Sequence, residues 1–297
     1  MRFIYQYPDA HGTDVDLLDS GPVSDLAMAA EKAGWHGFAF TEHPVPGSRW
    51  LEAGGHQTLD PFVALGHVAA VTSRLRLLTY LAVVPYRNPF LLAKAAATVD
   101  KLSGGRFILG VGTGYLKSEF HALGVDFDER NDLFDEALDV LPLHWKGEAF
   151  SFRGRHFDAR DVIARPRPVQ RPIPIWIGGN AKATLRRVAG RAQGWMPLTG
   201  PPELSTTART AHLATVADIG AKIGELREMA GVRADELDVA VAYMDPAIAH
   251  PTKEVERHRQ AIGELEDIGV TWMVLPGPIG DAHASLAFIQ AFGETYA

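Results

Sequence analysis

Short apolar runs alternate with longer amphipathic segments along most of the chain. The short runs have the length and composition of buried β-strands, whereas the longer segments repeat apolar residues at helical spacing. The predicted strands are 2–5, 37–41, 75–82, 106–111, 173–177, 195–198, 237–244 and 271–275. The predicted helices are 23–33, 61–71, 89–102, 127–144, 182–191, 206–230, 254–268 and 282–292.

This alternation is typical of parallel strands joined by right-handed crossover helices, which either close into a barrel or form an open sheet. Eight strands with eight helices favour the α/β class and a (β/α)8 TIM barrel, with an open doubly wound sheet as the alternative. A length of 297 residues suits one barrel domain over residues 1–297. At the helix ends, Asp60 before Pro61 predicts an N-cap, and Gly34 predicts a left-handed C-terminal cap.

Residues 146–172 follow neither the strand nor the helix period. Residues 150–157 are predicted to form a small hairpin, and residues 165–168 an extended segment. We interpret this stretch as an insertion after the fourth strand region, not as a second domain. Its arginines are either a solvated face or a ligand clamp.

Composition excludes several classes of function. The net charge is −7 without a long Lys or Arg run, so nucleic acid is not an expected partner. The chain has no cysteine, which excludes disulfides, thiolate metal sites and a cysteine nucleophile. No apolar run approaches the roughly 18 residues that span a bilayer, and the N-terminus enters a strand pattern directly. We therefore expect a cytoplasmic protein without a membrane partner.

The predicted fifth strand ends at two glycines, Gly178 and Gly179, and a helix follows at once. Glycines let the backbone approach a ligand, while the free amides and the dipole of the helix start attract an anion. The junction is therefore either a phosphate site or a tight turn that binds nothing.

The predicted second strand ends in Glu42 and His43, which are the strongest candidates for chemistry. Active sites of TIM barrels lie at the carboxyl ends of the strands, and imidazole titrates near neutral pH. His43 is therefore a candidate acid, base or hydrogen-bond donor. Glu42 either orients His43 or pairs with a Lys or Arg in the barrel mouth. The remaining histidines lack metal-ligand spacing, so no metal site is expected.

The predicted fourth strand carries Gly110, Gly112 and Gly114, followed by Tyr115. The dinucleotide fingerprint requires its third glycine one position later, so that motif fails. The alternate glycines either leave space for a planar ring or permit tight packing under a bulky neighbour. In the long loop of residues 45–58, Trp50 is expected to act as a lid or wall of the substrate pocket, or to cover the edge of the core.

Four segments together resemble the bacterial luciferase-like monooxygenase superfamily, especially its deazaflavin-dependent oxidoreductases. They are Gly-Phe-Ala-Phe-Thr-Glu-His at 37–43; Asn-Pro at 88–89 through Thr-Val-Asp-Lys-Leu-Ser-Gly-Gly-Arg at 98–106; Leu-Gly-Val-Gly-Thr-Gly at 109–114 with Glu-Phe at 119–120; and Pro-Ile-Trp-Ile-Gly-Gly at 174–179 with Gly-Trp at 194–195. The resemblance covers about residues 1–200 and implies a TIM barrel that binds FMN or coenzyme F420 at its C-terminal face.

The resemblance also implies roles for individual residues. A non-proline cis peptide is expected at Thr79–Tyr80, where a bulge would meet the cofactor ring, with Glu42 and His43 beside it. Thr113 matches a residue at the cofactor's polar tail or ring. The phosphate-binding turn corresponds to Gly178, Gly179, Asn180 and Ala181. Tyr115 stands where the sugar-phosphate dehydrogenases of this superfamily have a proton-donating glutamate, which puts glucose-6-phosphate oxidation in doubt. Its phenol stays a candidate catalytic donor of a hydrogen bond or proton.

Several functions follow from these features. The first is F420-dependent hydride transfer to or from a small organic substrate, and its alternative is an FMNH2- and O2-dependent monooxygenase. A flavin-binding barrel without catalysis is a hypothesis of another class. An aldolase or isomerase of a phosphate substrate is disfavoured, because no strand-end lysine or metal site is evident. The resemblance also implies a homodimer formed through barrel helices.

Overall fold

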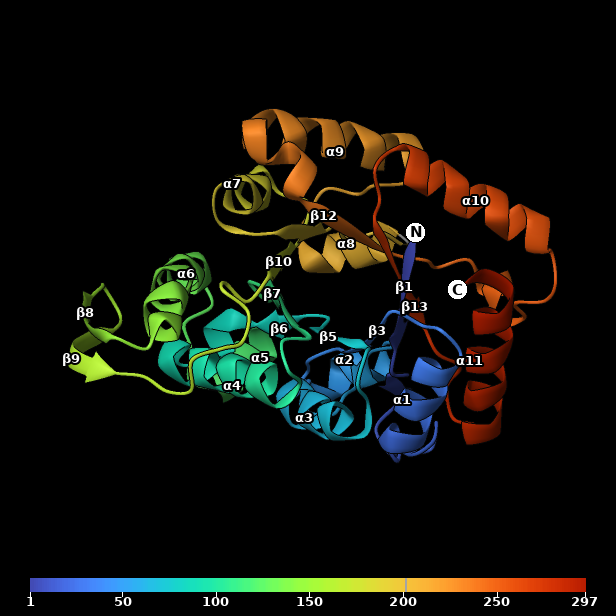
Figure 1. Ribbon diagram of the computed structural model, residues 1–297, viewed down its shortest axis with the longest axis horizontal. Helices are drawn as coiled ribbons and strands as arrows, with labels where there is room; N and C mark the ends of the chain where they lie inside the picture. Colours follow the sequence, from blue (N-terminus) through green and yellow to red (C-terminus); the bar gives the residue numbers. More distant parts are fainter. Residues whose placement is uncertain (201) are drawn as a thin grey trace.

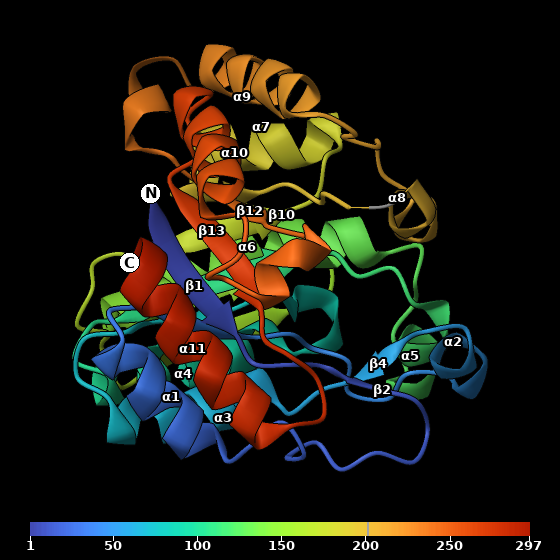
Figure 2. The same cartoon turned by 90° about the vertical axis from the view of Figure 1, so that its right-hand side faces the viewer.

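A computed structural model of the protein describes residues 1–200 and 202–297. Figure 1 and Figure 2 show parallel strands enclosed by helices, and the strand pairings close into a ring because β7 and β10 also pair with each other. The fold is the (β/α)8 TIM barrel that the sequence predicts. Within the described residues the ring is, in order, β1 (Arg2–Gln6), β3 (Gly37–Phe40), β5 (Arg76–Thr79), β7 (Phe107–Gly112), β10 (Ile175–Gly178), β11 (Gly194–Met196), β12 (Asp238–Ala242) and β13 (Trp272–Pro276).

The major helices pack on the outside of the ring, as Figure 1 shows. They are α1 (Val23–Lys32), α3 (Pro61–Val71), α4 (Pro89–Leu102), α6 (Arg130–Lys146), α7 (Lys182–Arg191), α9 (Val216–Ala230), α10 (Val255–Asp267) and α11 (Ala282–Tyr296). Shorter elements lie in the loops: β2 (Ala10–His11), α2 (Ser48–Glu52), β4 (His56–Gln57), β6 (Ala82–Val83), η1 (Val84–Tyr86), α5 (Lys117–Ala122), β8 (Ala149–Arg153), β9 (Asp158–Ile163), α8 (Pro202–Ala208), η2 (Gly231–Glu236) and η3 (Pro246–Ala249).

Apolar side chains fill two concentric layers. The inner layer lies inside the barrel and includes Leu78, Trp176 and Trp272, all fully or nearly fully buried. The outer layer lies between the strands and the helices and includes Phe38 and Phe107. Because successive side chains of a strand point to opposite faces, each strand supplies both layers, which explains the nearly continuous apolar runs in the sequence.

Both predicted helix-end signals are present. The Asp60 carboxylate accepts hydrogen bonds from the backbone amides of Phe62 and Val63 at 2.9 and 3.0 Å, so it caps α3. Gly34 follows α1 with a φ of +89°, a left-handed conformation that favours glycine.

The predicted strand 75–82 is two shorter strands, β5 and β6, separated by a cis peptide between Tyr80 and Leu81. The expected position, Thr79–Tyr80, is therefore wrong by one residue. The Tyr80 amide still donates to the Phe40 carbonyl at 2.6 Å, so the ladder with β3 continues through Tyr80. The bulge therefore begins one residue later than expected.

The predicted helix 206–230 is also wrong, because it is two helices, α8 and α9. Arg209 has a φ of +53°, which ends helical geometry at that point. Thr215 and Asp218 then form a capping box in which each side chain bonds the other residue's backbone amide. A loop of residues 209–215 separates the two helices.

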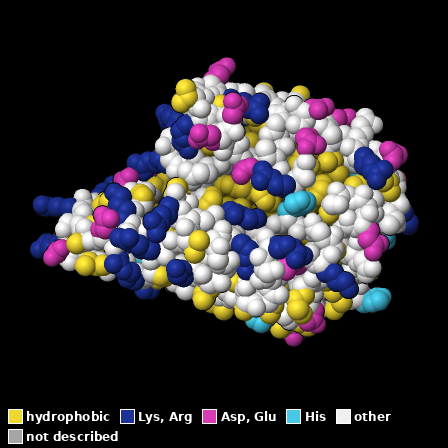
Figure 3. Space-filling model, viewed as in Figure 1, with side chains coloured by type: hydrophobic (Ala, Val, Ile, Leu, Met, Phe, Trp, Pro, Cys, Tyr) yellow, Lys and Arg dark blue, Asp and Glu magenta, His cyan; other side chains and the backbone are white. Residues whose placement is uncertain are grey.

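Residues 146–172 contain an antiparallel hairpin of β8 and β9, longer than the 150–157 hairpin that the sequence predicts. In Figure 3 it forms the extension on the left, where Lys and Arg side chains gather. The hairpin is tied to α6 by His156, whose Nδ1 lies 3.0 Å from Glu136, and by Arg155, which bonds Asp132 at 2.6 Å.

In the described part of the chain, no helix is long and apolar enough to cross a membrane.

Candidate active site

A cavity of about 420 Å³ opens at the carboxyl ends of the barrel strands. This is the face where TIM barrels place their active sites, and the volume lies in the range of small-molecule and cofactor pockets. Figure 3 shows a hollow with apolar side chains, bordered by Lys, Arg and His side chains. The wall includes strand-end residues of several strands, among them Gln6, Thr41, Tyr80, Gly112 and Gly178.

His43 lies in the wall of this cavity and is 9% exposed. Its Nδ1 is 3.2 Å from Oε2 of Glu119, and its Nε2 is 3.5 Å from the hydroxyl of Tyr115. The two residues predicted to be catalytic, His43 and Tyr115, thus lie side by side in the structure. A carboxylate, an imidazole and a phenol follow one another at the cavity wall.

Glu119 is the partner to which the sequence analysis assigned no role. It lies on α5, a short helix that was not predicted, and its side chain is fully buried. The phenol of Tyr86 donates to Oε2 at 2.9 Å, and the amide of Val45 donates to Oε1 at 3.2 Å. The only available signal was its place in the Glu-Phe motif shortly after Tyr115.

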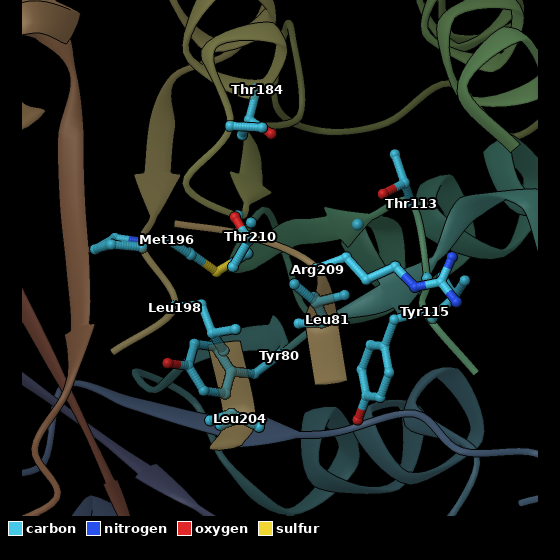
Figure 4. A pocket seen from close by; sticks show the side chains of 18 of the residues that line it. Tyr80, Leu81, Thr113, Tyr115, Thr184, Met196, Leu198, Leu204, Arg209 and Thr210 are labelled. Carbon is cyan, nitrogen blue, oxygen red and sulfur yellow. The ribbon is translucent and has the colours of Figure 1, made fainter. Parts of the chain in front are cut away.

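Tyr115 also lines the cavity, and burial followed by the nearby Glu119 raises its pKa above the ordinary tyrosine value. The phenol is therefore protonated at neutral pH and is available as a hydrogen-bond donor. Figure 4 shows its ring on the same side of the cavity as Thr113, which lines the wall as predicted from sequence.

Glu42 lines the cavity but does not contact His43 by a hydrogen bond. Its carboxylate accepts hydrogen bonds from the guanidinium of Arg87 and from the amide of Val83. Burial raises the pKa of Glu42, while Arg87 opposes this shift. The sequence left two roles open for Glu42, orienting His43 or pairing with a cation in the barrel mouth, and the structure shows the second. The ion pair with Arg87 holds the segment after β6 in place.

Trp50 does not belong to the cavity wall in the structure. Its ring packs on His43, with centroids 4.6 Å apart, and on His56 at 5.1 Å. Gly55 makes room for this indole, since an added Cβ would lie 2.3 Å from the ring. Trp50 therefore supports the His43 ring from the side of the 45–58 loop.

Asp9 and His56 form a second polar group that the sequence analysis missed. Burial raises the pKa of Asp9 to about 6, although Thr41 and Gln6 donate hydrogen bonds to it. Burial lowers the pKa of His56 to about 3, so the 3.6 Å contact between them joins a carboxylate to a neutral imidazole at neutral pH.

The turn after β10 lines the opposite end of the cavity through Gly178, Gly179, Ala181 and Thr184. Gly179 has a φ of +113°, which requires glycine, and α7 begins at Lys182 with no side-chain cap on its first amides. Free amides at a helix start suit an anion, which is one of the two interpretations that the sequence left open for this junction.

Asn180 is buried outside the cavity wall. Its amide N–H donates to Thr210 Oγ1 at 3.1 Å, and its Nδ2 donates to the carbonyls of Leu198 and Ala211 at 2.8 and 2.7 Å. Its polar groups are thus bound within the protein. Asn180 therefore ties the loop between α8 and α9 to the glycine turn.

Thr79 is also fully buried, and its hydroxyl donates to the carbonyl of Gly110 at 2.7 Å. Thr79 therefore lies beneath the bulge, away from the cavity, whereas Tyr80 and Leu81 line the cavity (Figure 4). A Cβ on Gly112 would lie 2.5 Å from the Leu81 side chain, and one on Gly178 would lie 2.3 Å from it. These glycines therefore make room for Leu81, which is the tight-packing interpretation.

Three arginines at the turn end of the cavity were not predicted as site residues. Arg187 makes a bidentate ion pair with Asp135 at 2.7 Å. Arg130 and Arg209 lie over the ring of Phe127, at 3.9 and 5.4 Å from its centroid. Within residues 1–200 and 202–297, neither of these two guanidinium groups forms a salt bridge. Figure 4 shows Arg209 extending toward Thr113 and Tyr115.

Comparison with known proteins identifies the family. Residues 1–272 match the model of the luciferase-like monooxygenases. The chain belongs to this family. It is 29% identical over 269 residues to the FMNH2-dependent dimethylsulfone monooxygenase of Pseudomonas putida, covering 86% of this chain and 68% of that protein.

Solved structures share the fold of this luciferase-like chain. Monooxygenase RslO1 of Streptomyces bottropensis gives a TM-score of 0.76 at 22% identity, covering 100% of this chain and 98% of that one. An F420-dependent secondary alcohol dehydrogenase in complex with an F420–acetone adduct gives 0.72 at 18% identity, covering 99% and 97%. Family membership makes the protein a flavin- or F420-dependent oxidoreductase or monooxygenase.

Among the described residues, no group of His, Asp and Glu has the geometry of a metal site.

Proposed function

We propose that this luciferase-like protein is an F420-dependent oxidoreductase that transfers a hydride to or from a small organic substrate. The cavity at the carboxyl ends of the strands receives both molecules. Support comes from the family and from the similarity in fold to the F420-dependent secondary alcohol dehydrogenase. The cavity adds support, because one end is rich in hydrogen-bonding groups for proton transfer and the other end is cationic.

The observation that favours F420 over FMN is the pair Arg130 and Arg209. Burial lowers the pKa of Arg130, and the positive charge of the nearby Arg209 lowers it further. Beside them, the Gly178–Gly179 turn already offers free amides for one phosphate. FMN has a single phosphate, whereas F420 continues beyond its phosphodiester into carboxylates. Two further cations therefore match the longer anionic tail.

The residues of the cavity fit such a cofactor. Leu81 provides an apolar surface at the centre of the cavity, with Met196 and Leu198 on another wall (Figure 4). Thr113 and Thr184 offer hydroxyl groups for polar atoms of the ring or tail. The bound cofactor supplies a hydride donor or acceptor, and the protein supplies orientation and proton transfer.

His43 handles the proton that accompanies the hydride. If a substrate alcohol is oxidised, the cofactor would take up the C–H hydride, and Nε2 of His43 would accept the hydroxyl proton; carbonyl reduction would reverse both transfers. Nε2 lies near the Tyr115 hydroxyl, which would donate a hydrogen bond to the substrate oxygen. The charge and atom balance is thus complete with one cofactor, one substrate and one proton.

The second candidate is an FMNH2- and O2-dependent monooxygenase. The observation that favours it is the 29% identity to the FMNH2-dependent dimethylsulfone monooxygenase. In that case Tyr115 would donate a hydrogen bond beside the flavin ring, Nε2 of His43 would accept one, and Arg130 would assist the Gly178–Gly179 turn in binding the phosphate.

Cofactor titration separates the two candidates. The cofactor-free protein is titrated with F420 and, separately, with FMN and FMNH2, while cofactor fluorescence is followed. We expect F420 to bind at least tenfold more tightly than either form of FMN, and Arg209→Ala to weaken F420 more than FMN. Micromolar affinity for FMN without measurable binding of F420 would contradict the proposal.

A flavin-binding barrel without catalysis is tested by His43→Ala. For an enzyme, we expect this variant to bind the cofactor within about threefold of wild type and to lose about 10²-fold or more in single-turnover rate. A library of small alcohols and carbonyl compounds supplies the substrates. Tight cofactor binding with no turnover of any substrate by the wild-type protein would favour the carrier.

A further inference from the structure

We infer that Glu119 is the positioning residue of His43, and that it fixes the imidazole as the Nδ1–H tautomer with Nε2 free toward the cavity. The inference deepens the proposed function, because it concerns the proton path of the same site. It rests on the hydrogen-bond geometry around one buried carboxyl group.

Glu119 is fully buried, and three donors face it. Tyr86 and His43 approach Oε2 at 2.9 and 3.2 Å, while the Val45 amide approaches Oε1 at 3.2 Å. No Lys or Arg in the described chain forms a salt bridge with it. A carboxylate only accepts hydrogen bonds, so all three neighbours must donate.

This requirement determines the tautomer of His43. The ring nitrogen beside Glu119 is Nδ1, which therefore has the proton, and a neutral imidazole then has its lone pair on Nε2. Nε2 is the nitrogen near the Tyr115 hydroxyl. The arrangement follows the logic of a carboxylate that orients a histidine, which in turn acts on a hydroxyl.

The neighbours of the imidazole hold the ring but do not replace Glu119. Trp50 and His56 pack on it at centroid distances of 4.6 and 4.8 Å, and the His43 amide donates to Thr58. Tyr86 gives Glu119 a second anchor, and burial with the nearby Glu119 raises the pKa of this phenol, so it stays a donor. Within the described residues, Glu119 is the one acceptor recorded for Nδ1.

Glu119→Gln changes this network in a defined way. A glutamine has one carbonyl oxygen and one amide group, and the Val45 amide needs the oxygen. The NH2 group then faces His43 and Tyr86 and donates a hydrogen bond to Nδ1 of His43. Because Nδ1 must now accept, the proton of the neutral imidazole lies on Nε2. The substitution is isosteric, so it reverses the tautomer without opening a cavity.

The test is nitrogen NMR of the cofactor-free protein with ¹⁵N-labelled histidine. Spectra are recorded at alkaline pH, where imidazole is neutral, and His43 is assigned by the signal lost in His43→Ala. We expect wild type to show the Nδ1–H pattern and Glu119→Gln to show mainly Nε2–H. Single-turnover rates with F420 should fall by about 10²-fold, with F420 affinity within threefold.

Glu136→Gln is the matched control, because Glu136 is another buried glutamate beside a histidine, His156, in the hairpin away from the cavity. It should change neither the His43 signals nor the rate. Should Glu119→Gln fail to fold, Glu119→Asp keeps the acceptor-only group and is expected to retain the Nδ1–H pattern.

An unchanged His43 tautomer in Glu119→Gln would overturn the inference, as would an Nε2–H pattern in the wild-type or Glu119→Asp protein. The NMR result does not depend on the cofactor. A protein that shows the tautomer change but no reaction with F420 therefore keeps the positioning role of Glu119 and loses the proposed function.

Discussion

At the residue scale, single glycines decide whether the bulge after β5 can lie at the cavity. Leu81 occupies space that side chains at positions 112 and 178 would fill. A protein core is close-packed, so a methyl group in such a place must displace its neighbour. The bulge, the glycine turn and the cofactor surface are thus one packing unit.

Gly178→Ala is expected to weaken cofactor binding by at least tenfold. The new Cβ would lie 2.3 Å from Leu81 and push it into the cavity. The control is Gly190→Ala on α7, where the new methyl group would meet no atom within 4 Å apart from its own stretch of helix. The control should keep full affinity and gain about 0.5–1 kcal/mol of stability. Fluorescence titration and urea unfolding measure both; equal affinities for the two variants would contradict the packing argument.

Asp9 is expected to make stability depend on pH in the mildly acidic range. Folding raises its pKa to about 6, from about 3.9 in an unfolded chain, so the native state holds the proton more tightly. Its contribution is fully present below about pH 4 and is lost as pH rises through about 6. His56 acts in the opposite sense, because its pKa falls to about 3 and its contribution is lost as pH falls below about 6.5.

The variant Asp9→Asn lacks the titratable carboxyl group, so its difference in stability from wild type reports the contribution of that group. The stability of wild type relative to Asp9→Asn should decline between about pH 4 and pH 6, by about 2 kcal/mol, less than the full shift because the side chain is 16% exposed. Urea unfolding at several pH values gives this difference, and a difference independent of pH would show that the carboxyl titrates alike in both states.

At the element scale, the loop between α8 and α9 is positioned from both sides. Asn180 binds it to the strand end, and Thr215 starts α9. These contacts explain how Arg209 comes to lie over the cavity although the sequence suggests one continuous helix. Helical periodicity on both sides concealed the break, whereas the Thr215 and Asp218 capping signal was readable from the sequence.

Thr215→Ala is expected to lower the free energy of unfolding by about 0.5–2 kcal/mol, because the first amides of α9 lose their acceptor. It should also weaken binding of the anionic cofactor several-fold, since the preceding loop presents Arg209. Thr98→Ala, in the interior of α4, is the control and should be neutral or slightly stabilising. Normal affinity in Thr215→Ala would indicate that the loop needs no cap to position Arg209.

At the scale of the whole molecule, the homodimer implied by the family resemblance stays a prediction. Apolar side chains on adjacent helices are exposed: Val63 on α3 is 75% exposed, and Leu91 and Leu102 on α4 are 69% and 67% exposed. Such a face on two packed helices suits a second copy of the chain.

We expect light scattering to give twice the chain mass of 32.3 kDa. The double substitution Val63→Glu and Leu91→Glu should yield monomers, whereas Val232→Glu, at a fully exposed position in η2, should leave the dimer intact. A wild-type protein of monomer mass would remove the prediction.

The barrel, the strand ends and the glycine turn were predictable because they depend on local periodicity and backbone conformation. His43, Tyr115 and Gly178 follow strands whose carboxyl ends must meet at one face. The cis peptide was placed one residue early, because the exact end of a ladder depends on the neighbouring strand. Asn180 stands in the predicted turn, but only its tertiary partners give it a structural position.

The sequence by itself therefore determined the fold, the family and the face on which the chemistry lies. Tertiary structure alone decided which side chains meet there: Glu119 with His43 across 76 positions of sequence, Arg209 with Arg130 over Phe127, and Asp9 with His56. The reason is physical. Periodicity records which face of an element is buried, whereas hydrogen bonds between distant loops depend on how those elements are packed together in three dimensions.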